Sequence, residues 1–250
     1  MRRRLGIVAV AMLVLASAMA CSTPDDDSTI AVFAAASLKS VFTTLGDRME
    51  TGMPGTNVAF SFAGSSDLVT QLSQGAFADV FASADTATMT KAVDAGLVAG
   101  APVNFATNTL TIVAPKGNSK NITSFADLGR PGIQVVVCAP QVPCGAATRK
   151  LEDTTGIRLS PVSEESSVVD VLGKVASGQA DAGLVYVTDA EAAGDDVTTI
   201  PFPESGEAVN TYSIAVLQQT KNRVAAQRFV DLVAGPQGRE ILSTAGFGAP

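Results

Sequence analysis

Two stretches of the chain place a serine where a predicted strand turns into a predicted helix. They span residues 34–38 and 62–66 and contain Ser37 and Ser65. The first N–H groups of a helix lack partners within the helix and lie at its positive end, so a hydroxyl beside them helps to form an anion site. Serines there also act as ordinary N-caps, which stabilise a helix by about 1 kcal/mol without any ligand. The pattern therefore predicts hydrogen-bond donation to an oxyanion, with helix capping as the alternative.

The composition argues against most hydrolytic enzymes. The chain has 250 residues, of which 46% are hydrophobic, and it contains neither histidine nor tryptophan. This is enough to bury one large core or two smaller ones. Without histidine the chain has no His general base, no Ser–His or Cys–His nucleophile pair, and none of the commonest nitrogen ligand of zinc. We expect a protein that is not an enzyme and that uses no cofactor.

The N-terminus has the parts of an export signal. Three arginines are followed by an apolar run over residues 5–15 and by small residues up to position 20. The run is shorter than the roughly 20 apolar residues of a membrane span. It ends at Cys21, so we predict a signal peptide over residues 1–20, lipidation of Cys21 as in bacterial lipoproteins, and an acidic tether over residues 21–28. Ordinary cleavage that leaves Cys21 unmodified is the alternative. Either outcome places the protein in the periplasm or, through the lipid, on the outer face of the cytoplasmic membrane.

The charge of the mature chain excludes one class of partner. Without residues 1–20 the chain has 14 basic and 24 acidic residues, a net charge of −10. Such a chain is unsuited to nucleic acid. Physiological salt screens its repulsion of a small anion beyond about 8 Å, so local donors decide whether an anion binds.

Two further cysteines, Cys138 and Cys144, are separated by five residues that include two prolines. Export permits a disulfide, and the short separation allows a tight loop. The spacing does not show whether the two Cα atoms approach within about 7 Å. We therefore predict a disulfide, with two buried thiols as the alternative.

Strand and helix patterns alternate along the chain. Strands are predicted at residues 29–33, 57–62, 79–82, 109–114, 133–137, 183–187 and 212–217, with helices after most of them. This alternation predicts an α/β fold with parallel sheets. Two such series in one chain predict two lobes, and the expected ligand site is the cleft between them.

Six segments, in this order and spacing, resemble the molybdate-binding proteins that feed ABC importers. They are VFAAASL at 32–38, FAGSS at 62–66, GAFADVFASAD at 75–85, VPCG at 142–145, GLVYVTDA at 183–190 and GPQ at 235–237. The resemblance covers nearly all of residues 29–250. It implies the two-lobed periplasmic binding protein (type II) fold, with residues 29–106 and 212–250 in lobe 1 and residues 107–211 in lobe 2. The chain crossings would lie near residues 104–110 and 209–213.

The resemblance also implies how a ligand is held: hydroxyls and backbone N–H groups surround a dehydrated tetrahedral oxyanion without a countercharge. Ser37 and Ser65 would donate from lobe 1, with Ser66 as a second choice for Ser65. Cys144 and Val168 would donate through their backbone N–H groups. The metal arrives only within the oxyanion, so no direct metal ligands are expected.

Tyr186 completes the implied set through its phenolic hydroxyl, although a tyrosine in a strand is more often a core aromatic whose hydroxyl has a partner. Val168 alone would indicate core packing. The chain departs from the family's usual alanine at Cys144 and its usual proline at Phe77, which affects the expected shape of those loops.

The resemblance implies capture of molybdate, and of tungstate, followed by delivery to an ABC transporter permease. We expect a monomer. Neutral donors suit this task, since each hydrogen bond to a charged group contributes about 1.5–3 kcal/mol and the anion must also be released. Alternatives are a binding protein for another oxyanion such as sulfate, a structural or adhesion lipoprotein, and an exported α/β hydrolase that uses Asp79 or Asp85.

Overall fold

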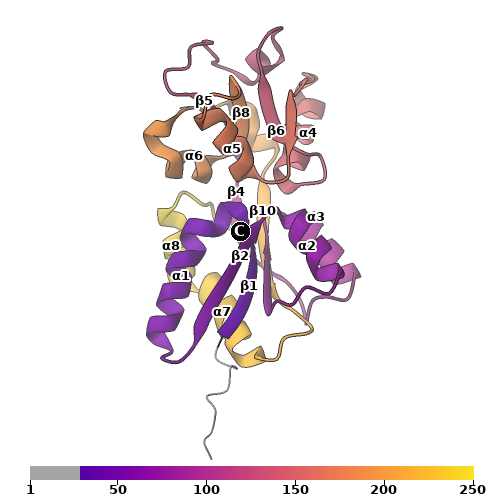
Figure 1. The fold of residues 1–250 in the computed structure, drawn as a ribbon, viewed down its shortest axis with the longest axis vertical. Helices are drawn as coiled ribbons and strands as arrows, with labels where there is room; N and C mark the ends of the chain where they lie inside the picture. Colours follow the sequence, from indigo (N-terminus) through magenta and orange to yellow (C-terminus); the bar gives the residue numbers. More distant parts are fainter. Residues whose placement is uncertain (1–28) are drawn as a thin grey trace, which may run out of the picture.

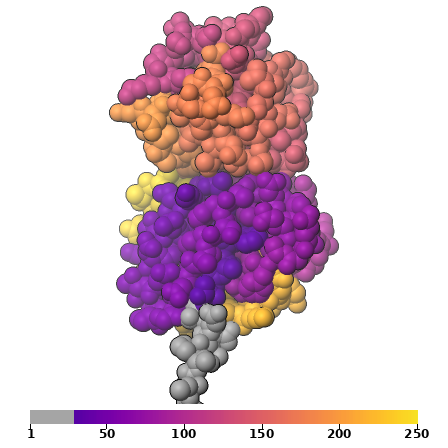
Figure 2. Space-filling view, in the orientation of Figure 1, coloured from indigo at the N-terminus to yellow at the C-terminus, as the bar shows by residue number. Residues whose placement is uncertain are grey.

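The computed structural model describes residues 29–250 of the chain. The predicted signal peptide, Cys21 and the tether lie outside these described residues. Two lobes are stacked along the long axis of the molecule, each built on a five-stranded sheet with helices packed against it (Figure 1). The space-filling view shows the two lobes in contact across one face (Figure 2).

Lobe 1 contains a sheet with the strand order β2-β1-β3-β10-β4. Its strands are β1 (Thr29–Ala35), β2 (Asn57–Ala63), β3 (Val80–Ser83), β4 (Val103–Asn108) and β10 (Asn210–Val216). Its helices are η2 (Ala36–Leu38), α1 (Lys39–Gly52), α2 (Ser65–Ser73), α3 (Thr86–Asp94), α7 (Arg223–Ala234) and α8 (Pro236–Thr244). Helices α2 and α3 cover one face of the sheet, and α1, α7 and α8 cover the other (Figure 1).

Lobe 2 contains a sheet with the strand order β7-β6-β8-β5-β9. Its strands are β5 (Leu110–Pro115), β6 (Val135–Cys138), β7 (Ser163–Glu165), β8 (Ala182–Tyr186) and β9 (Val197–Ile200). Its helices are η3 (Phe125–Gly129), α4 (Pro143–Thr155), α5 (Val168–Ala176), α6 (Val187–Ala193), η4 (Gly194–Asp196) and η5 (Pro203–Glu207).

Both sheets are mixed, so the prediction of wholly parallel sheets was wrong. Strand β1 runs parallel to β2 and β3, and β6 runs parallel to β7 and β8. However, β10 is antiparallel to β3 and β4, and β5 is antiparallel to β8 and β9. Strands β5 and β10 each come directly after a crossing from the other lobe. Neither is therefore joined to the preceding strand by the helical crossover within one sheet that parallel strands need.

The chain crosses from lobe 1 to lobe 2 at Thr109, between the end of β4 and the start of β5. It returns between β9 and β10 through η5. In lobe 1, β4 and β10 lie antiparallel with Asn108 opposite Asn210, so the two crossings lie side by side. The division of the chain into lobes at residues 106 and 212 stays a prediction.

The core of lobe 1 follows from the spacing of apolar residues. On α1 the buried side chains include Val41, Phe42, Leu45 and Met49, whose spacing places them on one face of the helix. The ring of Phe42 packs edge-on against Phe229 of α7 at 5.6 Å between centroids. Within residues 29–250 no helix combines the length and the apolar character of a membrane span.

Candidate anion-binding site

A small cavity lies where the lobes meet. Residues of both lobes line it, and none of them is charged: Ala35, Ala36, Ser37, Gly64, Ser65, Ala84, Val142, Pro143, Cys144, Ser167, Val168 and Tyr186. All five residues predicted to hold an oxyanion are therefore brought to one cavity from positions up to 149 residues apart in the sequence.

Four α-helices begin at the wall of this cavity. Gly64 precedes α2, Val142 precedes α4, Ser167 precedes α5 and Tyr186 precedes α6, and each of these N-cap residues lines the cavity. The unpaired N–H groups and the positive dipole ends of the helices thus converge on one space. This arrangement favours a negatively charged group without supplying any cationic side chain.

The two lobe 1 serines are not N-caps. The N-cap positions are Ala35 and Gly64, and neither makes a side-chain capping hydrogen bond. The Ser65 hydroxyl accepts a hydrogen bond of 3.0 Å from the Ala84 N–H, and the Ser37 hydroxyl lies 3.0 Å from that of Tyr212. Because Ser65 uses its oxygen as an acceptor, its proton remains available for an acceptor in the cavity.

Lobe 2 presents backbone donors at the starts of two helices. Pro143 is the first residue of α4 and has no N–H, so Cys144 supplies the first N–H of that helix. Val168 is the first residue of α5. Both side chains are buried. What these residues can offer a ligand is therefore the main chain.

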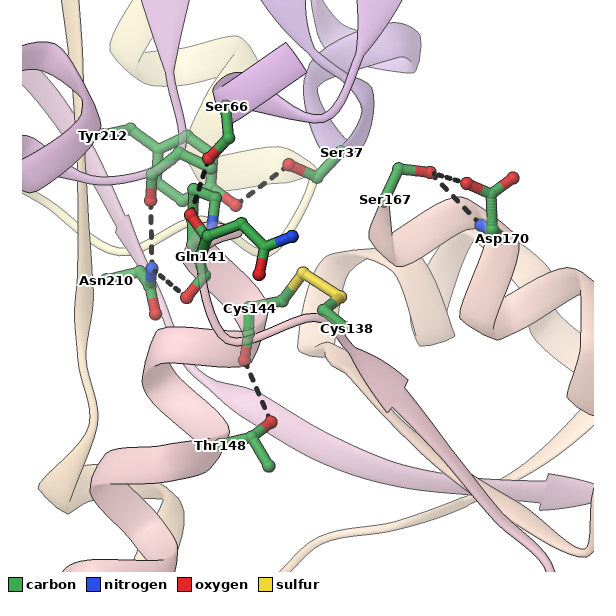
Figure 3. The surroundings of a disulfide bond; sticks show 12 residues. Ser37, Ser66, Cys138, Gln141, Cys144, Thr148, Ser167, Asp170, Asn210 and Tyr212 are labelled. Atoms are coloured by element: carbon green, nitrogen blue, oxygen red, sulfur yellow. Dashed lines mark hydrogen bonds between the residues drawn. A yellow bond between two sulfur atoms is a disulfide. The ribbon is translucent and has the colours of Figure 1, made fainter. Parts of the chain in front are cut away.

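The predicted disulfide between Cys138 and Cys144 is present, with the two Cα atoms 5.6 Å apart (Figure 3). It ties the end of β6 to the start of α4. Within the loop a turn is closed by a 2.9 Å hydrogen bond from the Val142 N–H to the Ala139 carbonyl. A side chain at Gly145 would begin 1.9 Å from that carbonyl, so this close approach requires glycine.

Tyr186 is the last residue of β8 and is 1% exposed. Among the described residues, the Tyr186 hydroxyl has no hydrogen-bond partner. The ring of Tyr212 packs edge-on against the ring of Tyr186. Burial raises the pKa of Tyr186 well above its usual value, and Tyr212 with the nearby carboxylates adds to the shift. The group is therefore a protonated donor that faces the cavity without a partner, unlike a core tyrosine whose hydroxyl is satisfied.

Asp189 belongs to the GLVYVTDA segment but was not predicted to have a role in the site. Asp189 lies in the first turn of α6, and its carboxylate accepts the backbone N–H of Tyr186. Its Oδ2 atom is buried and unpartnered among residues 29–250. Burial raises the pKa of Asp189 to about 7. It therefore places a titratable group directly behind the cavity wall.

Three other residues from the sequence analysis have structural contacts. The Ser66 hydroxyl donates to the Gln141 carbonyl at 2.6 Å, and Ser66 does not line the cavity. Asp79 accepts hydrogen bonds from Ala31 and Thr220, and Asp85 caps α3. Both carboxylates thus make structural hydrogen bonds, and neither lines the anion cavity. No cluster of three or more acidic or cysteine side chains able to hold a metal occurs in the described part of the chain.

Comparison with known proteins shows which family this chain belongs to. The family model of the bacterial extracellular solute-binding proteins matches residues 30–248. The molybdate-binding protein ModA of Mycobacterium tuberculosis H37Rv is 61% identical over 221 residues, which cover 88% of this chain and 85% of that protein. ModA of Escherichia coli K12 is 32% identical over 246 residues, 93% of this chain and 94% of that protein.

A solved structure shows the same fold. The periplasmic molybdate-binding protein of Azotobacter vinelandii aligns with a TM-score of 0.76 at 22% identity, over 88% of this chain and 99% of its own. The resemblance drawn from the six sequence segments is therefore confirmed. The chain belongs to the bacterial extracellular solute-binding proteins and, within them, to the family of the ModA molybdate-binding proteins.

Proposed function

We propose that this chain captures molybdate outside the cytoplasm and delivers it to the permease of an ABC transporter. The observation that carries the proposal is the convergence of Ser37, Ser65, Cys144, Val168 and Tyr186 on one uncharged cavity between the lobes. Relatives that share up to 61% of their residues with this chain carry the name molybdate-binding protein. In this proposal the protein carries out no covalent chemistry.

The donor set accounts for both binding and release. Hydroxyl and amide donors match the acceptor oxygens of a tetrahedral dianion, and each such bond contributes about 1.5–3 kcal/mol. Because donors come from both lobes, the anion stabilises the closed state more than an open one and shifts the population toward closure. With no buried cation to neutralise it, the anion leaves when the lobes separate.

The same donors exclude some competitors. A protonated phosphate needs an acceptor in the site. The backbone N–H groups cannot accept, and the Ser65 oxygen already accepts from the Ala84 N–H, so the proposed ligand groups favour a fully deprotonated anion. Sulfate and tungstate carry acceptors like those of molybdate, so cavity size would separate sulfate from the other two. We include tungstate in the proposed specificity and exclude sulfate.

The test is thermal unfolding of the mature chain with molybdate, tungstate or sulfate, followed by calorimetry with each anion. A ligand at about 1,000 times its Kd adds roughly 4 kcal/mol to the free energy of unfolding. Molybdate and tungstate should raise the melting temperature at micromolar concentration, and sulfate should not. Saturation by sulfate in the same range would contradict the proposal.

We further propose that the protein works as a monomer tethered by a lipid on Cys21. This proposal rests on the signal pattern and the acidic tether in the sequence. Mass spectrometry of the N-terminal peptide of membrane-extracted protein would show the added lipid or an unmodified cysteine.

A further inference from the structure

Two hydrogen bonds run from lobe 1 to the loop bridged by the disulfide, and neither donor lines the anion cavity. The Ser66 hydroxyl, at the start of α2, donates to the Gln141 carbonyl at 2.6 Å. The Asn210 side-chain amide, at the start of β10, donates to the Pro143 carbonyl at 3.4 Å. Figure 3 shows both bonds beside the Cys138–Cys144 bridge.

Asn210 connects the two walls of the cavity through a single group. The same Nδ2 atom donates to the Ala84 carbonyl of lobe 1 at 3.1 Å, and Ala84 and Pro143 both line the anion cavity. Asn210 is 6% exposed. Asparagine is depleted in strands, so a buried one whose amide spans two lobes needs a reason beyond strand formation.

The surroundings of Asn210 are hollow on its other side. A second pocket is lined by Asn210 and Pro143 together with Asp85, Lys150 and Thr211. Asn210 lines this second pocket and not the anion cavity, so water on that side can take over its hydrogen bonds when the lobes separate. The contact to Pro143 then belongs to the arrangement in which the lobes are together.

The lobes are closely apposed around Ser66 as well. A side chain at Gly64, two residues earlier, would begin 2.0 Å from the backbone oxygen of Ser166 in lobe 2. Only a closed arrangement brings these main chains so near. The bond from Ser66 to Gln141 forms at this same edge, so it exists only while the lobes are together.

We propose that Ser66 and Asn210 are positioning residues that latch lobe 1 onto the disulfide-bridged loop in the closed state, and this rests on the proposed anion binding. Neither side chain touches the anion. The bonds form when the lobes come together, with or without the anion, and in the loaded protein they slow its release.

The test compares wild type with Ser66→Ala and Asn210→Asp in stopped-flow kinetics with molybdate. Loss of one hydrogen bond should raise koff roughly three- to tenfold in Ser66→Ala. Asn210→Asp places a carboxylate against two carbonyl oxygens and should raise koff more than tenfold. Asn104→Asp is the matched control, because Asn104 is exposed on the neighbouring strand β4, and its koff should equal that of wild type.

A second readout reports closure without depending on molybdate. A donor–acceptor dye pair, with one dye on each lobe, gives the closed fraction in single-molecule fluorescence, and both latch variants should lower it. A merely structural serine would lower the melting temperature of ligand-free Ser66→Ala without changing the closed fraction.

The outcomes separate the two proposals. A wild type that ignores molybdate while the variants still lose closed fraction contradicts the proposed function and retains the latch. Variants that match wild type in both koff and closed fraction overturn the latch, whether or not the wild type binds molybdate.

Discussion

The two walls of the anion cavity are built in different ways. On the lobe 1 wall, Ser37 and Ser65 have hydroxyls that already contact Tyr212 and the Ala84 N–H in their own lobe. On the lobe 2 wall, the Tyr186 hydroxyl is buried and has no hydrogen bond among the described residues. In the proposed binding mode, the lobe 1 hydroxyls are thus oriented before a ligand arrives, while the Tyr186 hydroxyl of lobe 2 gains its partner from the ligand.

The walls also differ in how the main chain is held. The lobe 2 wall includes a loop closed by a disulfide, and both latch hydrogen bonds end on that loop. The lobe 1 wall has only hydrogen bonds and packing. We infer that lobe 1 makes the first contact with the anion and that the stiff loop of lobe 2 sets the geometry of the closed state.

The largest expected effect comes from removing both hydroxyls of the lobe 1 wall. In Ser37→Ala with Ser65→Ala, two hydrogen bonds to a charged ligand disappear, each of about 1.5–3 kcal/mol, so the Kd for molybdate should rise roughly 10²- to 10⁴-fold. Isothermal titration calorimetry measures this directly.

The same double variant should lose some ligand-free stability. The Ala84 N–H loses its acceptor, which costs about 1–3 kcal/mol for a buried group. Thr43→Ala, an exposed change on α1, serves as the control. An unchanged Kd in the double variant would mean that the lobe 1 wall does not hold the anion.

A single change in the lobe 2 wall should weaken molybdate binding without lowering the stability of the ligand-free protein. Tyr186→Phe removes one donor to the anion, so the Kd should rise roughly 10- to 100-fold. The hydroxyl has no partner without ligand, so its removal should leave the ligand-free melting temperature unchanged or raise it. A fall in that temperature together with an unchanged Kd would identify Tyr186 as an ordinary core residue.

The next effect tests the stiffness of the lobe 2 loop. Cys138→Ser with Cys144→Ala removes the bridge but keeps the backbone N–H at position 144. A loop of this size contributes about 2 kcal/mol to stability in the chain-entropy treatment, and a looser loop should raise the Kd only a few-fold. Denaturant unfolding and calorimetry measure the two quantities. A Kd equal to that of wild type would show that the helix start alone fixes the donor.

Most residues of the two cavity walls could be predicted from the sequence, since short local patterns mark them. Strand, small-residue turn and serine at a helix start marked Ser37 and Ser65, and the VPCG and GLVYVTDA segments marked Cys144 and Tyr186 through their resemblance to a family. The structure brings these residues to one cavity. Their roles as ligands stay predictions.

The remaining features depend on tertiary contacts that leave no local pattern. Asn210 interacts with carbonyls from two lobes, and Ser66 bonds to a residue 75 positions away. Strands β5 and β10 were predicted, but their antiparallel direction was missed because it is set by the interlobe crossings rather than by periodicity. The positions of the crossings came only from the resemblance to a family, since no local pattern marks them.

The smallest effect on binding is expected from the acid behind the lobe 2 wall. Burial raises the pKa of Asp189 to about 7 from an ordinary value of 3.8. The folded state therefore binds this proton more tightly than the unfolded chain does. The stabilisation from the neutral carboxyl is complete below about pH 4 and is lost as the pH rises through 7, a change on the order of 4 kcal/mol.

Asp189→Asn keeps an acceptor for the Tyr186 N–H and removes the titration. Relative to wild type, this variant should gain stability between pH 5 and pH 8 in urea unfolding, while exposed Asp196→Asn should follow wild type throughout. At pH 6, where the wild-type carboxyl is mostly neutral, the Kd for molybdate should scarcely change. A stability difference that is constant with pH would show that Asp189 does not titrate in this range. The walls would then differ in their donors and cross-link but not in buried charge.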